Sequence, residues 1–385
     1  MSGAITVARR RAAGWLDIRP SICHVHPVGR GLTAVVVLTL VLAGSGCGSN
    51  EEAAPVTVTV QQTVTAPSSV VTLRDTVEAE PAPPEEGDPL DGLRNAPNVS
   101  TMSVEEAVEL MNAQDYRAVA AVAAVSDAIA AAVRIVVGQL SAGGRLMYFG
   151  AGTSGRLAVL DAAECPPTFR TDPEMVQGLI AGGMPAILKA QEGAEDLPEN
   201  GARDVEAHGV GAKDLLVGIA ASGTTPYVRG ALAAARARGA FTAIVACSPP
   251  PPETLAHADV AVIAVTGPEV VTGSTRMKAG TATKLILNTI TTGAMIRLGK
   301  TYGNLMVDLR ATNLKLKDRS ERIVMEVCAV TRDVARQLIT DSGGVVKTAI
   351  VMHELGVDRD DAEAALERGG GIIRKVVRRE PPPVR

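Results

Sequence analysis

The residues best placed to do chemistry lie in Gly150–Gly155, which reads GAGTSG and follows the apolar run Arg145–Phe149. A strand that leads through a glycine-rich turn with two hydroxyl groups into a helix is how a parallel sheet forms a seat for phosphate. We therefore expect Thr153 and Ser154 to bind substrate. The same spacing satisfies G-x-G-x-x-G, so a dinucleotide-binding fold is the first alternative.

Two later loops share these features, because each follows an expected strand, carries hydroxyl groups and opens a helix. They are Ser222–Thr225, which reads SGTT, and Thr272–Lys278, which reads TGSTRMK. The carboxyl ends of parallel strands meet at one edge of a sheet, so the three loops could surround one phosphate with N–H and hydroxyl donors. A simpler interpretation is that each hydroxyl only caps its helix. The candidate substrate-binding residues of these two loops are Ser222, Thr224, Ser274, Thr275 and Lys278.

The second expected strand separates the phosphosugar and dinucleotide alternatives. A dinucleotide fold places an acidic residue at the end of that strand, where it binds the ribose. Here the strand runs through Gly178–Ala181 into Gly182-Gly183-Met184 and offers no carboxylate. The sequence therefore favours a phosphosugar site over a nicotinamide cofactor.

Two carboxylates are candidates for acid–base chemistry. Glu164 precedes Pro166-Pro167, which we expect to end the helix at this glutamate. The negative end of the helix dipole would disfavour the ionised carboxylate and so favour a proton donor, although a solvated helix-end acid is the simpler interpretation. Glu195 lies in an acidic segment, where spacing alone does not distinguish it from Glu192 or Asp196.

Composition excludes several classes of protein. The chain has 385 residues, of which 46% are hydrophobic and 2% aromatic, and its formal net charge is −4. A nucleic-acid-binding protein would show a basic balance. The cysteines are widely spaced and form no C-x-x-C or His-paired pattern, so we expect neither a zinc site nor a disulfide framework.

Strand patterns alternate with helical patterns, which indicates an α/β fold with a parallel sheet covered on both faces. After the first strand, four further strands are expected, at Met175–Ala181, Leu215–Ala220, Phe241–Ala246 and Val260–Val265. Ser103 caps a first helix, and a second is expected over about Tyr116–Leu140. From about Arg319 onward, the sequence shows only helical patterns. The expected divisions are a leader (1–47), a Pro/Thr/Val-rich linker (48–90), the α/β domain (91–318) and a helical domain (319–385).

The leader is basic, then apolar over Leu32–Leu42, and ends in small residues before Cys47. This is the pattern of a secretory signal, and the cysteine suggests a bacterial lipoprotein anchored to a membrane. Gly44 stands where the lipoprotein motif usually has Leu. A start codon placed too early, or a merely disordered leader, is the alternative.

Gly150–Phe169 closely resembles the signature of N-acetylmuramic acid 6-phosphate etherases, which belong to the sugar-isomerase (SIS) superfamily together with glucokinase regulatory proteins. The resemblance runs from about Leu93 to the C-terminus. It implies a three-layer αβα SIS domain with a five-stranded parallel sheet and a small C-terminal helical (UBA-like) domain. Its further motifs are LIAGG (Leu179–Gly183), EGAED (Glu192–Asp196), GIAASGTTPY (Gly218–Tyr227), EVVTGSTRMKAGT (Glu269–Thr281) and GNLMVDLRATN (Gly303–Asn313).

The resemblance also implies an activity, namely cleavage of the lactyl ether of a phosphorylated amino sugar to N-acetylglucosamine 6-phosphate and D-lactate. It assigns the two catalytic glutamates to Glu164 and Glu195. Our hypothesis for the division of roles is that Glu164 is the proton donor and Glu195 is the base at C2. Elimination next to the C1 aldehyde followed by hydration needs one acid and one base, without a metal or other cofactor. Such enzymes act in the cytoplasm, and members of the superfamily commonly form homodimers.

Three other functions remain open from the sequence. The chain could be a non-catalytic phosphosugar-binding regulator, a phosphosugar isomerase, or a lipid-anchored binding protein. Both glutamates are present, which favours the enzyme over the regulator. An isomerase often uses a histidine to open the sugar ring, and none of His208, His257 and His353 follows the carboxyl end of an expected strand.

Overall fold

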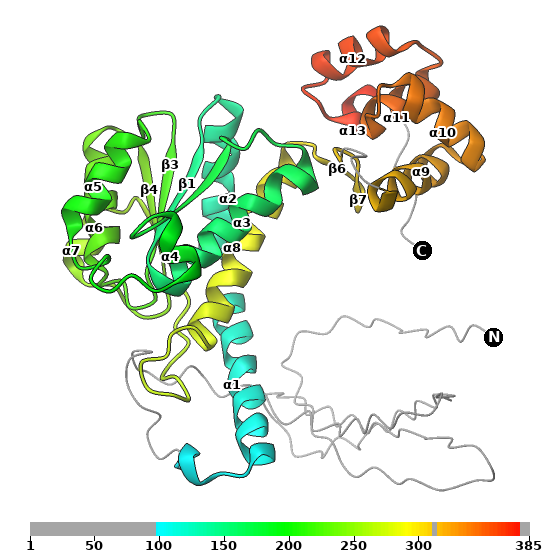
Figure 1. The fold of residues 1–385 in the computed structure, drawn as a ribbon. Helices are drawn as coiled ribbons and strands as arrows, with labels where there is room; N and C mark the ends of the chain where they lie inside the picture. Colours follow the sequence, from blue (N-terminus) through cyan, green and yellow to red (C-terminus); the bar gives the residue numbers. More distant parts are fainter. Residues whose placement is uncertain (1–97, 310–313, 378–385) are drawn as a thin grey trace, which may run out of the picture. The chain divides into compact units, whose positions relative to one another are not determined.

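The computed structural model describes residues 98–309 and 314–377, and Figure 1 labels most of its elements. The predictions for the leader, the linker and Cys47 lie outside these residues. The elements up to the end of the sheet are η1 (Val99–Thr101), α1 (Val104–Ala124), α2 (Ser126–Ser141), β1 (Leu146–Gly150), α3 (Gly152–Phe169), β2 (Val176–Ile180), α4 (Met184–Leu188), α5 (Pro198–Ala207), β3 (Leu215–Ile219), α6 (Pro226–Ala237), β4 (Phe241–Ala246), α7 (Pro252–Leu255) and β5 (Val260–Ile263). They are followed by α8 (Lys278–Arg297), β6 (Thr301–Tyr302), β7 (Leu305–Met306), α9 (Leu314–Cys328), α10 (Arg332–Asp341), α11 (Val346–Leu355), α12 (Arg359–Arg368) and α13 (Ile373–Val376).

The five expected strands form one sheet in the order β2-β1-β3-β4-β5, and every neighbouring pair is parallel. Gly150 at the end of β1 lies opposite Ile180 of β2 and Ile219 of β3. The first and second hydroxyl-bearing loops therefore leave the sheet at the same edge. The predicted α/β class and parallel sheet are confirmed.

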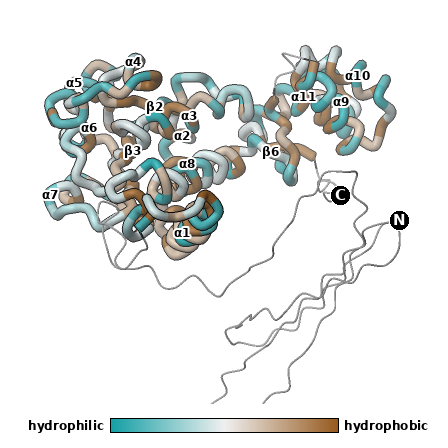
Figure 2. The backbone as a smooth tube through the Cα atoms, turned by 60° about the horizontal axis from the view of Figure 1, so that its bottom comes forward, coloured by the Kyte–Doolittle hydropathy of each residue, from teal (hydrophilic) through white to brown (hydrophobic). Residues whose placement is uncertain are grey.

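Alternate residues of the buried strands face the two helical layers. Leu146 and Tyr148 belong to a hydrophobic cluster with α2, α3 and α8, whereas Met147 and Phe149 belong to a cluster with α5 and α6. This period of two, combined with apolar residues at every position, is what a strand covered on both faces requires. Figure 2 shows the apolar strand β3 inside the domain and the largely hydrophilic helix α5 outside it.

The helices before the sheet differ from the prediction. Ser103 caps α1 as expected, in a capping box with Glu106. However, α1 continues through Tyr116, and the break falls at Val125, where the chain bends by 60°. The Ser126 hydroxyl donates to the Ala123 carbonyl at 2.6 Å, so a side chain takes over part of the helical hydrogen bonding at the bend.

Helix α3 does not end at Glu164, which corrects the sequence prediction. The helix continues through Pro166 and Pro167 to Phe169 and closes with Arg170 in the left-handed conformation. Each proline removes one helical N–H, but Cys165 and Phe169, one turn apart, are both buried in the main hydrophobic cluster. Packing of this last turn offsets the lost hydrogen bonds, which a sequence rule about proline does not include.

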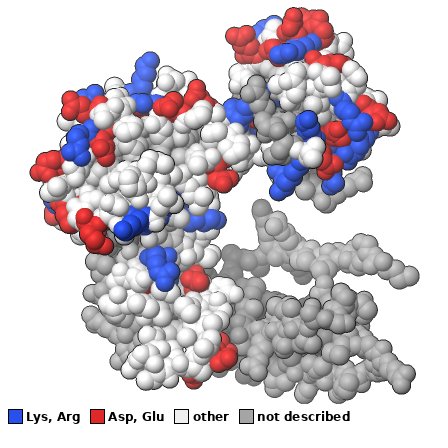
Figure 3. Space-filling view, in the orientation of Figure 1, with Lys and Arg blue, Asp and Glu red and all other residues white. Residues whose placement is uncertain are grey.

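The C-terminal helices pack around a hydrophobic cluster of their own, formed by residues of α9 to α13 together with Tyr302, Val307 and Leu309. The predicted helical pattern is confirmed, and the structure adds that Gly356 closes α11 in the left-handed conformation and that the Asp358 side chain caps α12. Acidic and basic side chains alternate over the face of these helices seen in Figure 3. Some of them form ion pairs, such as Arg332 with Asp318 and Glu321.

Within the described residues, no single helix is both long and apolar enough to cross a membrane. Helices α1 and α2 meet the criteria of length and composition only as a bent pair.

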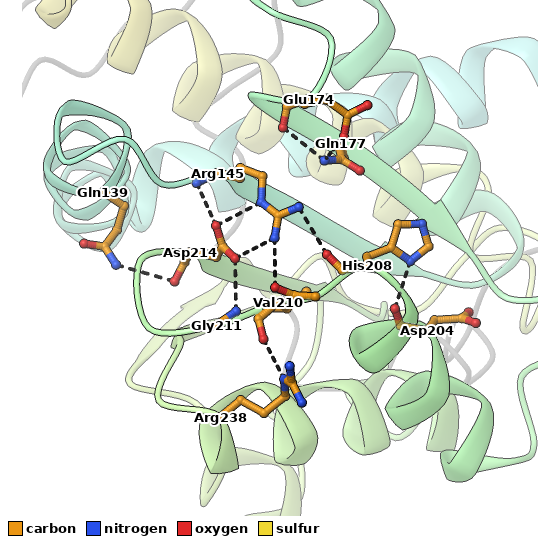
Figure 4. Close-up of polar contacts among 11 residues, drawn as sticks. Gln139, Arg145, Glu174, Gln177, Asp204, His208, Val210, Gly211, Asp214 and Arg238 are labelled. Carbon is orange, nitrogen blue, oxygen red and sulfur yellow. Dashed lines mark hydrogen bonds and ion pairs between the residues drawn. The ribbon is translucent and has the colours of Figure 1, made fainter.

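At the amino end of the sheet, a charged pair joins the segments that precede β1 and β3. Sequence analysis did not identify this pair. Asp214, just before β3, accepts hydrogen bonds from the backbone and guanidinium of Arg145, just before β1, and from the Gly211 N–H (Figure 4). Arg145 also donates to the carbonyls of His208 and Gly209. Burial opposes ionisation of Asp214, but these hydrogen bonds outweigh it and hold the pKa of Asp214 below its ordinary value.

We predict that Asp214→Asn lowers the free energy of unfolding at neutral pH by about 2–4 kcal/mol, because Arg145 is left without its anionic partner. A carboxyl group with a lowered pKa in the folded state contributes its stabilisation above the ordinary pKa and loses it as pH falls through the lowered value. The difference between wild type and variant, measured by urea unfolding, should therefore shrink at acidic pH. Asp333→Asn, which changes a side chain that is 92% exposed, is the control; equal effects of the two variants would contradict the prediction.

Candidate functional site

The first loop is held by close packing of glycines. A Cβ on Gly150 would lie 2.8 Å from the Gly155 nitrogen, and a Cβ on Gly155 would lie 2.5 Å from Cγ1 of Ile180. Gly152 has φ +52°, a conformation that favours glycine. Here the G-x-G-x-x-G spacing is explained by the approach of α3 to β1 and β2. Thr153 and Ser154 fall in the first turn of α3, where backbone N–H groups have no helical acceptor.

The second loop joins its two candidate hydroxyls to each other. The Ser222 Oγ and Thr224 Oγ1 atoms lie 2.6 Å apart, and the Thr224 N–H donates to the Ser222 hydroxyl at 3.3 Å. Gly223 has φ +73°, and a Cβ there would lie 2.5 Å from Pro250. If one hydroxyl donates to the other, the second keeps its own proton for an outside acceptor.

In the third loop, the first backbone N–H groups of α8 already have a hydrogen-bond acceptor inside the protein. Glu269, a fully buried carboxylate, accepts the backbone N–H groups of Lys278 and Ala279 at 3.1 and 2.9 Å. These first N–H groups of α8 are therefore already used inside the protein, so the hydroxyl groups of this loop are its remaining candidate donors to a phosphate. Burial raises the pKa of Glu269 above its ordinary value, although the two N–H donors oppose that rise. The half-buried Ser274 and Thr275 remain as hydroxyl candidates of this loop.

Lys278 lies deeper than a surface phosphate ligand would. Its side chain is 1% exposed, and its ammonium group donates to Oε1 of Gln114 on α1 at 2.7 Å. This contact ties the start of α8 to α1. Sequence analysis singled out Lys278 but missed both Glu269 and Gln114, and the only signal for Glu269 was its place at the start of the EVVTGSTRMKAGT motif.

The three loops approach one another at the carboxyl edge of the sheet. A Cβ on Gly280, in the first turn of α8, would lie 3.5 Å from both the Thr153 methyl group and the Thr275 carbonyl oxygen. Ala221, which precedes Ser222, packs against a small cluster that contains Cys247 and Ala279. The structure thus gathers the hydroxyl-bearing loops as their positions after parallel strands predicted.

None of these hydroxyls caps its helix. The N-cap residues of α3, α6 and α8 are Ala151, Thr225 and Met277, and none of the three makes a side-chain capping hydrogen bond. The simpler interpretation of the hydroxyls as helix caps is therefore wrong.

The two candidate glutamates come from different elements. Glu164 is exposed on α3, one turn before its end, so the argument from the helix dipole loses its premise. Glu195 is exposed in the turn before α5, and its backbone carbonyl accepts the Tyr227 N–H at 3.0 Å. Tyr227 is the second residue of α6, so this bond holds the Glu195 segment beside the helix that follows the second loop. No hydrogen bond joins the side chains of Glu164 and Glu195 in the part of the chain that the structure describes.

A parallel five-stranded sheet between helical layers, with three hydroxyl-bearing loops at its carboxyl edge, defines an SIS-type α/β domain. The sequence model described as the glucokinase regulatory protein N-terminal SIS domain matches residues 128–236. A phosphoheptose isomerase structure from Francisella tularensis is 18% identical, with a TM-score of 0.40, and the match covers 51% of this chain and 100% of that one.

Comparison with curated relatives identifies the family to which the chain belongs. The chain is 49% identical over 280 residues to the N-acetylmuramic acid 6-phosphate etherase of Synechocystis sp., a match that covers 73% of this chain and 92% of the relative. It is 51% identical over 278 residues to the etherase of Mycolicibacterium smegmatis, covering 72% and 92%. The chain therefore belongs to the N-acetylmuramic acid 6-phosphate etherase family.

We predict that Glu269→Gln loosens the start of α8, because an amide offers one acceptor where the carboxylate offers two. The loss of a hydrogen bond to a charged group should lower the free energy of unfolding by about 1.5–3 kcal/mol. Amide hydrogen exchange at Lys278 and Ala279 should accelerate as well. Glu253→Gln, an exposed residue of α7, is the matched control. Unchanged exchange at both amides would refute a capping role for Glu269.

Proposed function

We propose that this chain is a carbon–oxygen lyase that cleaves the D-lactyl ether of N-acetylmuramic acid 6-phosphate. The products are N-acetylglucosamine 6-phosphate and D-lactate, and the reaction serves recycling of cell-wall amino sugars. The observation that carries the proposal is the roughly 50% identity to etherases over about nine-tenths of their length, with both candidate glutamates present. The regulatory alternative rests on a model that matches residues 128–236 alone, so the enzyme is preferred.

In the proposed site, the phosphate group lies among the first turn of α3 and the second and third loops. The N–H groups at the start of α3 provide partial positive charge, and the hydroxyls of Thr153, Ser154, Ser222 and Thr224 provide donors. Ser274 and Thr275 complete the seat from the third loop. Lys278 adds positive charge at the base of this loop while its ammonium group stays on Gln114.

The proposed reaction begins with the open-chain sugar, whose C2 proton is acidic because the C1 aldehyde stabilises the resulting enolate. Glu195 removes this proton, and Glu164 protonates the ether oxygen as the C3–O bond to lactate breaks. Water then adds to C3 of the unsaturated aldehyde and restores the hydroxyl group. General acid and general base catalysis each contribute about 10²–10⁴-fold to such steps. The exposure of both glutamates leaves them accessible to a substrate that arrives from solvent.

We predict that Glu164→Gln and Glu195→Gln each lower kcat for D-lactate release by about 10²–10⁴-fold. The two variants should differ in exchange of the C2 proton with D2O, followed by NMR. Glu164→Gln should keep this exchange, because the base is intact, whereas Glu195→Gln should lose it.

Glu192→Gln, a neighbouring acidic residue, is the control and should retain wild-type kinetics. Release of lactate at the wild-type rate by Glu164→Gln would overturn its assignment as the proton donor. If Glu164→Gln instead loses exchange of the C2 proton and Glu195→Gln keeps it, Glu164 would be the base and Glu195 the proton donor.

We predict that Ser222→Ala and Thr224→Ala raise KM for the phosphorylated substrate roughly ten- to hundredfold, because each removes a hydroxyl from the phosphate seat. Thr340→Ala is the control, since its hydroxyl donates to the Arg336 carbonyl within α10. Steady-state kinetics of lactate release measure the effect. An unchanged KM in both loop variants would remove the second loop from the phosphate site.

We further propose a homodimer, supported by an apolar groove of about 790 Å³ beside α2 and α8. Ile296, which lines this groove, is 50% exposed. Sedimentation of the wild type and of Ile296→Glu tests this arrangement, and a monomeric wild type would refute it.

The proposed location is the cytoplasm, where the phosphorylated substrate is formed during uptake. The alternative is a membrane lipoprotein anchored through Cys47. Cell fractionation combined with mass spectrometry of the N-terminus distinguishes the two, because acylation of Cys47 in the membrane fraction would overturn the cytoplasmic proposal.

A further inference from the structure

The helical C-terminal region brings together three residues that have no part in the proposed reaction. Cys328 is the last residue of α9, and His353 and Glu354 lie in the last turn of α11. One potential ligand atom from each lies within 4.8 Å of those of the other two. The cysteine is separated from the histidine by 25 positions, so the cluster does not form a sequence motif with short spacing.

Packing of α9 against α11 accounts for the juxtaposition. Val324 and Val327 of α9 share a hydrophobic cluster with Ala349 and Ile350 of α11, so the two helices approach along their apolar faces. The chain leaves α9 sharply, because Ala329 adopts φ +55°, a conformation uncommon for a residue with a Cβ. These constraints hold the end of α9 beside the end of α11.

The electrostatic setting of the cluster favours a cation. All three residues lie at the C-terminal ends of their helices, where the aligned backbone dipoles give each helix a partial negative charge. A thiolate and a carboxylate would add two further negative charges. A divalent cation at this point would therefore complement both the helix ends and the side chains.

The donor set selects the kind of cation. Thiolate and imidazole ligands suit zinc and related transition metals, whereas calcium and magnesium prefer oxygen ligands. Zinc bonds are about 2.3 Å to sulfur and about 2.0–2.2 Å to nitrogen and oxygen, so atoms bound to one tetrahedral ion lie about 3.3–3.8 Å apart. The observed separations of up to 4.8 Å approach this range, and small side-chain rotations would close the difference.

We propose that Cys328, His353 and Glu354 form a binding site for Zn²⁺, with water as the fourth ligand. Cys328 is 4% exposed and His353 is exposed, so the site has a buried thiolate at its base and opens to solvent on the imidazole side. The bound ion links the end of α9 to the end of α11. Because the thiol must lose its proton, binding releases a proton and weakens at acidic pH.

The test uses the full-length protein, treated with chelator and then titrated with Zn²⁺ by calorimetry and with Co²⁺ by absorption spectroscopy. Co²⁺ should give the intense thiolate-to-metal charge-transfer band together with visible bands of a tetrahedral site. Cys328→Ser should abolish the charge-transfer band. His353→Ala and Glu354→Gln should each weaken Zn²⁺ binding by at least about tenfold.

Controls separate this site from other thiol and imidazole groups of the chain. Cys23, His24 and His26 are close in sequence, so a Cys23→Ser/His24→Ala/His26→Ala variant is measured in parallel and should keep the Co²⁺ band. His257→Ala, which changes a half-buried histidine outside the cluster, is the second control. His353 is exposed, so His353→Ala keeps the experiment decisive even if Cys328→Ser fails to fold. A Co²⁺ band that survives Cys328→Ser, Zn²⁺ affinity unchanged in His353→Ala, or absence of stoichiometric Zn²⁺ binding by wild type would overturn the proposal.

Discussion

The close approach of α3 to the backbones of β1 and β2 is the constraint on which the candidate site depends. Three glycines permit it, because a Cβ on Gly150, Gly155 or Gly178 would lie within 2.5–2.8 Å of atoms across the contact. The start of α3 can then follow the end of β1 with one intervening residue. This contact determines where Thr153 and Ser154 lie, and through the length of the helix it also determines where Glu164 lies. Larger side chains would move the loop and the proposed proton donor together.

A second constraint acts at the start of α8. The buried Glu269 carboxylate accepts the first N–H groups of the helix, while Lys278 extends to Gln114 on α1. The loop that carries Ser274 and Thr275 is therefore fixed at its helical end by charged groups inside the protein. A buried carboxylate is costly unless it is hydrogen-bonded, so this arrangement is expected to be sensitive to substitution. The proposed phosphate seat thus depends on glycine packing at one loop and on a buried carboxylate at another.

Proline provides a useful example of local rules overruled by packing. Pro166-Pro167 would end an isolated helix, yet α3 continues to Phe169 because Cys165 and Phe169 are buried against the sheet. Similarly, the predicted break near Tyr116 is absent. The chain bends instead at Val125, where the Ser126 hydroxyl donates a hydrogen bond to the Ala123 carbonyl. In both places the sequence predicted the existence of the helices correctly and their ends incorrectly. The end of α3 depends on packing against residues distant in the chain, whereas the bend at Val125 involves a local hydrogen bond.

The sequence by itself determined the parallel α/β fold, the strands, and the gathering of three hydroxyl-bearing loops at one sheet edge. These features follow from local apolar patterns and from the geometry of parallel strands, which place successive carboxyl ends together. Resemblance to known enzymes was needed to single out Glu195 from Glu192 and Asp196. Only the tertiary structure decided that Glu269 occupies the start of α8, that Arg145 and Asp214 join two strands, and that Cys328 meets His353 and Glu354. The second and third contacts join residues distant in the chain, and the first spans a loop of nine positions. All three depend on packing and burial, which no local pattern encodes.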